Sequence, residues 1–327
     1  MRIDLHTHFY PIEYLRTLEE KGDGFEFATD SFGRTIVKKV GTRFFTVTPP
    51  MQDPELRFPE MDAAGVDVAV LSLSAPSVYF APDELGHELS RVTNEKLVEL
   101  RDRYPKRFMC FATTPLQNPE MAVEELRRAI TKLGMNGVIV GSNINGKPLN
   151  SPEYEQFWAT ASDLEIPVLL HPMPPLGGEM MKEYGLAPLV GFIFDSDLAA
   201  ARMIFDGIFE RYPNMKFILP HLGGAITILM ERWDHGFREY PDCRVRISKP
   251  PSYYLKKMFF DVVCFHKPAL MCCYSSVGAS QMVLGSDYPH VIGDIYRCVS
   301  SVSEMDISED EKELIYGGNA RRILKMN

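Results

Sequence analysis

Two histidines, His6 and His8, stand two positions apart at the end of the apolar run that opens the chain. Side chains of a β-strand alternate between its two faces, so residues two positions apart point the same way. Two imidazoles on one side of a strand end supply half of a metal site. The spacing therefore predicts that this strand end helps to bind a metal ion.

Three later apolar segments end in residues of the same kind, namely His171, His221 and Asp287. A single histidine at a strand end is more often an ordinary polar residue than a ligand. Four strand ends with matching chemistry are hard to attribute to packing alone. Imidazole and carboxylate groups together suit zinc, and also manganese or iron. On spacing alone, any of the five side chains qualifies as a ligand.

Short apolar segments alternate with segments of helical periodicity along nearly the whole chain. The expected strands are Arg2–Leu5, Val66–Leu73, Phe108–Ala112, Gly137–Val140, Val168–Leu170, Phe217–Leu219, Met258–Val262 and Met282–Leu284. The expected helices are Glu84–Tyr104, Pro119–Leu133, Pro152–Leu164, Leu198–Arg211, Ala225–Tyr240 and Pro268–Val277. Such alternation predicts an α/β fold with a parallel sheet, and eight repeats predict a closed (β/α)8 TIM barrel. A doubly wound open sheet is the main rival, but the Gly-x-Gly-x-x-Gly motif of its dinucleotide-binding form is absent.

The stretch Gly24–Pro50 departs from this alternation and contains short β segments at Phe25–Thr29, Thr35–Val40 and Phe44–Val47. We predict a small β insertion after the first strand, placed over the barrel mouth. Catalytic residues of such barrels gather at the C-terminal strand ends, where loops build the active site. The candidate ligands should therefore meet at one mouth. Because no linker is evident, we expect residues 1–327 to form a single domain.

The overall composition limits the class of partner. The chain has 35 basic and 44 acidic residues and a net charge of −9, which argues against nucleic acid or a membrane surface. No apolar run approaches the roughly 20 residues that span a bilayer. The six cysteines show no Cys-x-x-Cys spacing, so we expect reduced structural thiols and a cytoplasmic protein. A small molecule is the expected partner.

Several motifs, in order along the chain, resemble those of the amidohydrolase superfamily. The similarity is to the branch that contains aminocarboxymuconate semialdehyde decarboxylase and the γ-resorcylate-type decarboxylases. His-x-His alone is weakly specific, but the ordered set is strongly so. The matching segments are Asp4–Pro11, Glu60–Val66, His171–Pro172, Pro220–Gly224, Gly285–Pro289 and Gly318–Ala320.

The resemblance assigns roles that spacing alone leaves open. It implies one divalent metal ion, zinc as the first expectation and manganese as the alternative. It implies that the ion is held by His6, His8, His171 and Asp287. His221 is then the general acid/base beside the metal rather than a fifth ligand.

The resemblance also implies substrate contacts. In the decarboxylases resembled, an arginine on the helix after the His221 motif reaches the neighbouring subunit's substrate carboxylate. Arg232 matches that position, which implies a homodimer. The muconate enzymes carry another substrate arginine in the β insertion, where the best register places Thr46, with Arg43 three residues earlier. Either Arg43 substitutes or the function differs. His290 replaces what is often an apolar aromatic residue and is close enough along the chain to reach the substrate.

The activity implied is that of a metal-dependent, non-oxidative decarboxylase of a small aromatic or dienoic carboxylic acid. In one route His221 helps to activate water, which adds to the substrate before carbon dioxide leaves. In the other, a carboxylic acid at Asp287 protonates the ring carbon of a hydroxybenzoate.

Two other functions compete with decarboxylation. The first is a hydrolase or hydratase that uses the same site on a lactone, amide or unsaturated acid. The fourth strand ends in Val140-Gly141-Ser142-Asn143, without the lysine that bridges two metals in many hydrolytic members, which favours one metal. The second is a non-catalytic binding protein. It conflicts with the retention of five polar site residues, which are costly to bury without a purpose.

Overall fold

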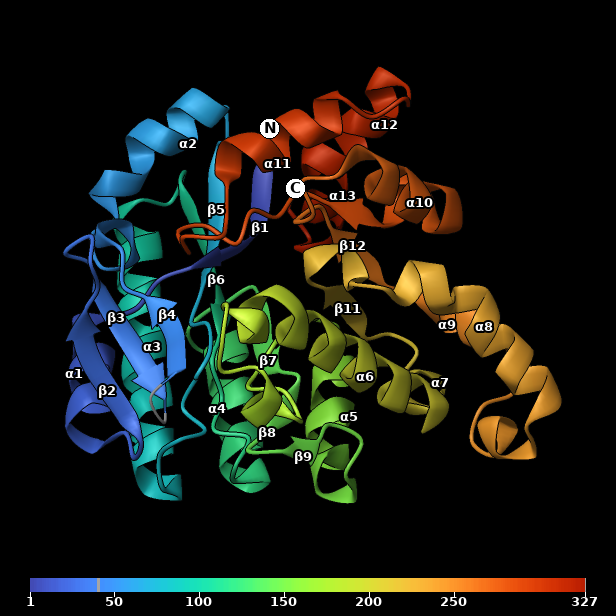
Figure 1. Ribbon diagram of the computed structural model, residues 1–327, viewed down its shortest axis with the longest axis horizontal. Helices are drawn as coiled ribbons and strands as arrows, with labels where there is room; N and C mark the ends of the chain where they lie inside the picture. Colours follow the sequence, from blue (N-terminus) through green and yellow to red (C-terminus); the bar gives the residue numbers. More distant parts are fainter. Residues whose placement is uncertain (40–41, 327) are drawn as a thin grey trace.

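Eight parallel strands form the centre of the computed structural model, which describes residues 1–39 and 42–326 (Figure 1). Their order is β1 (Ile3–His8), β5 (Val68–Ser72), β6 (Phe108–Ala112), β7 (Gly137–Gly141), β10 (Pro167–His171), β11 (Lys216–Leu219), β12 (Phe259–Asp261) and β13 (Met282–Val283). The first and last strands close the ring, because Leu5 N donates to Leu284 O at 3.0 Å. His8 N donates to Tyr288 O at 2.8 Å a little further along. The predicted (β/α)8 barrel is confirmed.

The helices surround the barrel and cap one of its ends. They are α1 (Ile12–Lys21), α2 (Phe58–Ala64), α3 (Asp83–Arg103), α4 (Pro119–Thr131), α5 (Glu155–Asp163), α6 (Phe192–Phe205), α7 (Ile208–Arg211), α8 (Ile226–Glu239), α9 (Pro251–Leu255), α10 (Lys267–Val277), α11 (Ile295–Ser303), α12 (Glu309–Glu313) and α13 (Asn319–Ile323). Local sequence signals explain several of their starts. At α4, for example, Asn118 accepts a hydrogen bond from Met121 N, and Pro119 occupies the first turn.

One expected helix is wrong. The segment Leu198–Arg211 is not a single helix but the end of α6 followed by the short α7. The break falls at Gly207, whose φ of 79° lies in the left-handed region that favours glycine. A Cβ at this position would also lie 2.4 Å from Arg246 O. The apolar periodicity continues through the break, which is why it concealed the interruption.

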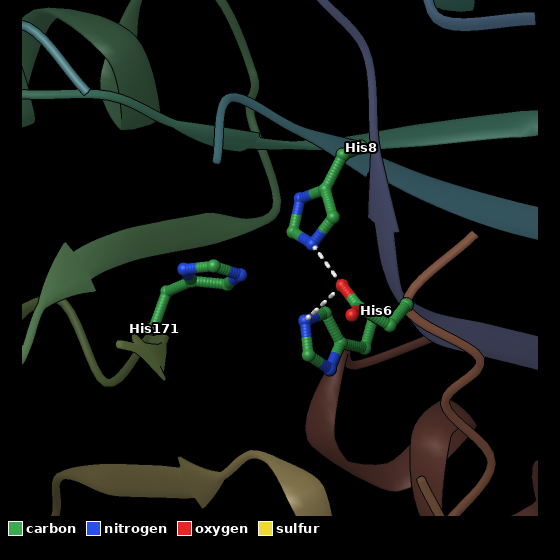
Figure 2. A group of neighbouring side chains, drawn as sticks. His6, His8 and His171 are labelled. Atoms are coloured by element: carbon green, nitrogen blue, oxygen red, sulfur yellow. Dashed lines mark hydrogen bonds and ion pairs between the residues drawn. The ribbon is translucent and has the colours of Figure 1, made fainter. Parts of the chain in front are cut away.

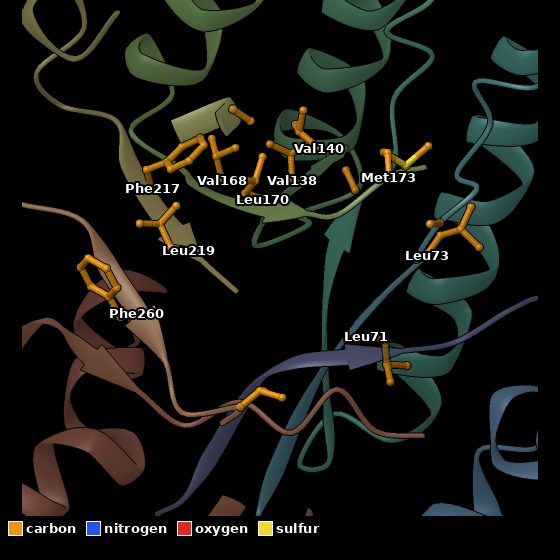
Figure 3. Close-up of a cluster of buried hydrophobic side chains, with 14 of the residues drawn as sticks. Leu71, Leu73, Val138, Val140, Val168, Leu170, Met173, Phe217, Leu219 and Phe260 are labelled. Carbon is orange, nitrogen blue, oxygen red and sulfur yellow. The ribbon is translucent and has the colours of Figure 1, made fainter. Parts of the chain in front are cut away.

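The apolar core has two layers. An inner cluster takes side chains from all eight barrel strands, including Ile3, Val70, Leu169 and Ile218, and also Ile323 of α13. The outer cluster lies between the strands and the surrounding helices, and Figure 3 shows part of it on neighbouring strands. Since strands of a barrel are covered on both faces, they appear in the sequence as continuous apolar runs. That is the pattern from which they were predicted.

An irregularity in β1 sets the direction of the histidines. Ile3 pairs with Val68 and His8 pairs with Ser72, with a shift of register between Asp4 and Thr7. Positions 68 and 72 share a face of β5, whereas positions 3 and 8 would lie on opposite faces of a regular strand. The extra residue of the bulge resolves this conflict. It lets Ile3 fill the barrel interior while His8, further along, still faces inward.

The β insertion forms a separate three-stranded antiparallel sheet of β2 (Phe25–Thr29), β3 (Thr35–Lys39) and β4 (Thr42–Thr46). Val40, expected at the end of the second of these strands, lies outside the described residues. The third strand was expected at Phe44–Val47 and is corrected to Thr42–Thr46, because its pairing with β3 begins at the Lys39–Thr42 pair. A further hairpin of β8 (Asn143–Ile144) and β9 (Lys147–Pro148) follows β7.

Within residues 1–39 and 42–326, no helix combines the length and the apolar character that crossing a bilayer would take.

Candidate metal centre

Four potential ligands converge at the C-terminal ends of the barrel strands. His6 and His8 come from β1, His171 from the end of β10, and Asp287 from the loop after β13. One ligand atom from each lies within 4.8 Å of the others, and all four residues are buried. Figure 2 shows the rings of His6, His8 and His171 turned toward one another. The structure thus brings four of the five candidate side chains together at one mouth of the barrel, and their role as metal ligands stays a prediction.

Each of the three imidazoles is oriented by a hydrogen bond at Nδ1. His6 Nδ1 lies 2.7 Å from Asp261 Oδ2, and His171 Nδ1 lies 3.1 Å from Pro172 O. His8 Nδ1 lies 3.1 Å from Ser72 Oγ, whose own proton is donated to Thr7 O at 2.9 Å. All three partners therefore accept, so each Nδ1 carries the proton and each Nε2 presents its lone pair to the centre.

Two acceptors face each other at this centre. With its proton on Nδ1, His8 directs the Nε2 lone pair at Asp287 Oδ1, only 3.0 Å away. His6 Nε2 lies 3.5 Å from the same oxygen and has no hydrogen-bond partner within the described ranges. Buried lone pairs that converge on a carboxylate need a cation between them. The donor set therefore fits a divalent metal ion.

The electrostatics of the ligands also fit a cation. Burial lowers the pKa of His8 to about 3 and that of His171 well below its usual value, so both rings are neutral. Burial acts to raise the pKa of Asp287, but the four neighbouring imidazoles of His221, His290, His8 and His6 outweigh it. The net pKa of Asp287 is well below the usual value, so this side chain is an anion. Burial also acts to lower the pKa of His6, but its hydrogen bond to Asp261 and the nearby carboxylate charges outweigh it and raise that pKa. His8, His171 and Asp287 thus have the neutral-imidazole and carboxylate forms that bind metals, and a cation that binds His6 displaces any proton from its Nε2.

His221 stands on the far side of Asp287. Its Nε2 lies 3.7 Å from Asp287 Oδ2, whereas His6 and His8 approach the other oxygen. The backbone has positive φ at four successive residues from His221 to Gly224, with values between 53° and 66°. Two of these residues are glycines that leave no room for a side chain, since a Cβ at Gly224 would lie 2.3 Å from Asp197 Oδ1. This turn carries the imidazole out of the strand direction and over the mouth.

A cavity of about 470 Å³ reaches the site, where His171, His221 and Asp287 line it. His6 and His8 lie within 3.5 Å of Asp287 and just outside the lining, and these five side chains are called the floor. Strand β4 of the insertion forms part of the cavity wall. The remaining wall is largely apolar and consists of Phe44, Phe45, Ala75, Pro172, Pro188, Leu189, Phe192, Ile193, Val263, Phe265, Val291 and Ile292, with Cys264 among them. Such a cavity suits a small molecule with a flat apolar body.

The family model described as "Amidohydrolase" matches residues 3–326. The chain belongs to the amidohydrolase family. The resemblance drawn from the ordered motifs is thereby confirmed.

Curated relatives of this amidohydrolase include decarboxylases. It is 32% identical to the 2-amino-3-carboxymuconate-6-semialdehyde decarboxylase of Dictyostelium discoideum, over 100% of this chain and 92% of that protein. It is 30% identical to the γ-resorcylate decarboxylase of Rhizobium sp. (strain MTP-10005), over 85% of this chain and 88% of that protein. A solved dihydroxybenzoic acid decarboxylase of Polaromonas sp. JS666, with bound manganese and the inhibitor 2-nitroresorcinol, superposes with a TM-score of 0.81. That structure is 26% identical and covers 100% of this chain and 97% of the other.

The expected substrate contacts of this amidohydrolase fall in different places. His290 lines the cavity and lies 3.3 Å through Nε2 from Ser74 Oγ. Arg43 lines the outer edge of the cavity, where its guanidinium donates to Asp30 at 3.0 Å. Arg232 is exposed on α8 and lies outside the residues that line the cavity in the described ranges. The structure thus brings His290 and Arg43 to the cavity and leaves Arg232 outside its lining.

Sequence reasoning missed the residues that orient the ligands. Asp261 ends β12 and follows the same rule as the other candidates, a polar residue at the end of an apolar strand, so that signal was available. Ser72 is the last residue of β5 and Ser74 comes two positions later, and neither gave such a signal, because serine is common at strand ends and in loops. His87, His235 and His266, which did not share the strand-end pattern, lie outside the cavity lining in the described residues.

Proposed function

We propose that this amidohydrolase is a metal-dependent, non-oxidative decarboxylase of a small aromatic or dienoic carboxylic acid. The observation that carries this proposal is the donor set of His6, His8, His171 and Asp287 at the floor of an apolar cavity, with His221 beside it. Relatives that span most of the chain are named decarboxylases, which supports this reaction over others of the family.

The four residues of this donor set are proposed to hold one divalent ion. Zinc is the first expectation and manganese the alternative, because both accept imidazole and carboxylate ligands. When bound, the ion supplies positive charge that draws electrons from a carboxylate substrate and lowers the barrier to losing carbon dioxide.

His221 and Asp287 are proposed to handle the proton. Asp287 directs one oxygen toward the ligand histidines and the other toward His221, so it can exchange a proton with that imidazole. If Asp287 protonates the ring carbon, it must first receive a proton from His221, because its low pKa keeps it ionised at rest. If instead water adds to the substrate, His221 is the base that accepts its proton.

His290 and Arg43 are proposed to contact the substrate. His290 offers a polar edge within an otherwise apolar wall, held by Ser74, which also lies 3.1 Å from His171 Nε2. Arg43 is one of two arginines on Asp30, so the three side chains together carry a net positive charge at the rim. That charge favours an anionic group at the outer end of the substrate.

The homodimer, with Arg232 near the neighbouring subunit's site, is also proposed. Ile228 and Arg232 are one turn apart on α8 and both are exposed, with Ile228 at 73%. Several large apolar side chains between residues 176 and 198 are exposed as well, among them Leu189 and Phe194. Exposed large apolar side chains of this kind are typical of a subunit interface. The cytoplasmic location expected from the cysteines stays a prediction.

The decisive experiment measures carbon dioxide released by the metal-loaded protein from a panel of ortho-hydroxybenzoates and from aminocarboxymuconate semialdehyde. Release that depends on Asp287 establishes decarboxylation and selects the aromatic or the dienoic class. If a protein with metal bound releases none from any substrate, decarboxylation is wrong, and lactones, amides and unsaturated acids should be tested for hydrolysis or hydration.

A further inference from the structure

One buried carboxylate touches both parts of the site. Asp261, at the end of β12, is fully buried and lies 2.7 Å through Oδ2 from Nδ1 of His6. Its Oδ1 accepts hydrogen bonds from the backbone of Leu222 and of Val263, both at 3.0 Å. Leu222 directly follows His221. A single side chain thus joins a proposed metal ligand to the loop of the proposed acid/base.

That loop needs a fixed partner. Both His221 and Leu222 have positive φ, at 53° and 58°, a conformation that residues with a Cβ seldom adopt. The hydrogen bond from Leu222 N to Asp261 holds the backbone at this unfavourable point. Without it, the loop is free to relax to a commoner conformation, and the imidazole of His221 moves away from Asp287.

We propose that Asp261 is a positioning residue that sets the tautomer of His6 and the place of His221 together. This inference rests on the proposed function in assigning a proton-handling role to His221, but its metal-binding half does not. A carboxylate accepts at both oxygens. It can therefore keep the proton of His6 on Nδ1 and bind the loop amides at the same time.

The isosteric change Asp261→Asn prevents one side chain from accepting both from His6 and from the loop amides, because an amide has one accepting and one donating end. In one orientation, the amide oxygen accepts the hydrogen bonds from the two backbone N–H groups, and the NH2 group faces His6 Nδ1. The NH2 group then forces the ring proton of His6 onto Nε2, where it blocks metal binding. In the other orientation, the amide oxygen accepts the hydrogen bond from His6 Nδ1. The NH2 group then faces two backbone N–H donors, which repel it, and the loop is displaced. Either orientation damages one half of the site.

The first measurement is the affinity for zinc, by competition with a chromophoric chelator, which does not depend on turnover. We expect Asp261→Asn to raise the dissociation constant about 10- to 100-fold, to lower turnover at saturating metal, or to do both. The matched control is Asp234→Asn. Asp234 is also buried and accepts from Ser252 N and Oγ, but it lies between α8 and α9, away from the cavity. The control should retain metal affinity and turnover.

A double variant tests the loop half. In the His221→Ala background, Asp261→Asn should cause no further loss of residual turnover at saturating metal, because the group it positions is already gone. Equal loss in both backgrounds, or parental metal affinity together with parental turnover in the single variant, overturns the proposal.

If Asp261→Asn fails to fold by circular dichroism, Asp261→Glu, which moves the carboxylate by one methylene, is expected to show the same losses. If the parent protein decarboxylates nothing, the function fails, while the zinc titration still decides the metal half.

Discussion

The floor and the rim of the cavity are built differently. At the floor, His6, His8 and His171 are buried, and each is oriented at Nδ1 by a hydrogen-bond partner. At the rim, Leu189 and Val291 are more than half exposed, and Arg43 donates to Asp30, a carboxylate of its own insertion. The floor is attached to barrel strands, whereas the rim belongs to segments between them. The floor can hold reacting groups rigidly, while the rim is free to differ between relatives and so to choose substrates.

The largest effect is expected at the floor. Asp287→Ala removes a ligand and the partner of His221 together, so turnover should fall at least about 10³-fold and bound metal should drop. Carbon dioxide release and metal content per subunit check both halves of this expectation. Near-normal turnover would show that Asp287 is neither a ligand nor a proton-handling residue. It would also contradict the placement of the reacting groups at the floor.

His221→Ala should separate proton handling from metal binding. The variant should lose about 10²- to 10⁴-fold in turnover, as expected for loss of a general acid/base, and should keep its metal. Metal content by atomic absorption, next to turnover, provides the test. A stoichiometric loss of metal would make His221 a fifth ligand and would contradict its placement on the far side of Asp287.

Arg232→Ala tests whether the rim is completed by a second subunit. We expect kcat/KM to fall about 10-fold or more, because a charged partner of the substrate carboxylate is lost. Subunits of Arg232→Ala and His221→Ala, mixed and exchanged, should regain activity, since one site of each hybrid dimer has both residues. If exchange is shown by a tag on one variant and activity does not return, Arg232 does not act across the interface.

His290→Phe should change substrate choice and leave the floor intact. Loss of the hydrogen bond from the His290 imidazole is expected to raise KM by about 2- to 10-fold for substrates with a polar group facing residue 290. Little change in kcat is expected. A substrate of the same size without that group is the control. Equal changes for both substrates, or a fall in kcat alone, would place His290 with the reacting groups.

The smallest effect on turnover is expected from Asp197→Asn, whose main consequence is on stability. Burial raises the pKa of Asp197 to about 7, so the folded state holds a proton that the unfolded state releases from about pH 4 upward. Stability contributed by this group therefore falls as pH rises from about 4 to about 7. Between pH 5 and pH 8 the variant should gain up to about 3 kcal/mol relative to the parent in urea unfolding. A pH-independent difference would contradict this assignment.

The sequence predicts the floor better than the rim for physical reasons. Strand-end residues such as His171 and Asp287 are brought together by the barrel topology itself, so alternation and spacing are enough to place them. The bulge in β1 and the break at Gly207 arise from backbone conformations that the apolar pattern does not encode. Arg43 contacts Asp30 at the rim, and the role proposed for Arg232 depends on a neighbouring subunit. Neither relation follows from strand and helix periodicity.

Three of the four proposed metal ligands come from the first and last barrel strands, since His6 and His8 lie on β1 and Asp287 follows β13. A nascent polypeptide that has emerged only as far as His171 has three imidazoles and no carboxylate to complete the set. High-affinity uptake of the ion must therefore await the final strand, when β1 and β13 meet. The ion would then link the first and last barrel strands, which are separated by almost the whole chain. Joining segments that far apart in the sequence costs the most chain entropy. Late loading of this kind makes metal content a direct readout of whether the barrel has closed.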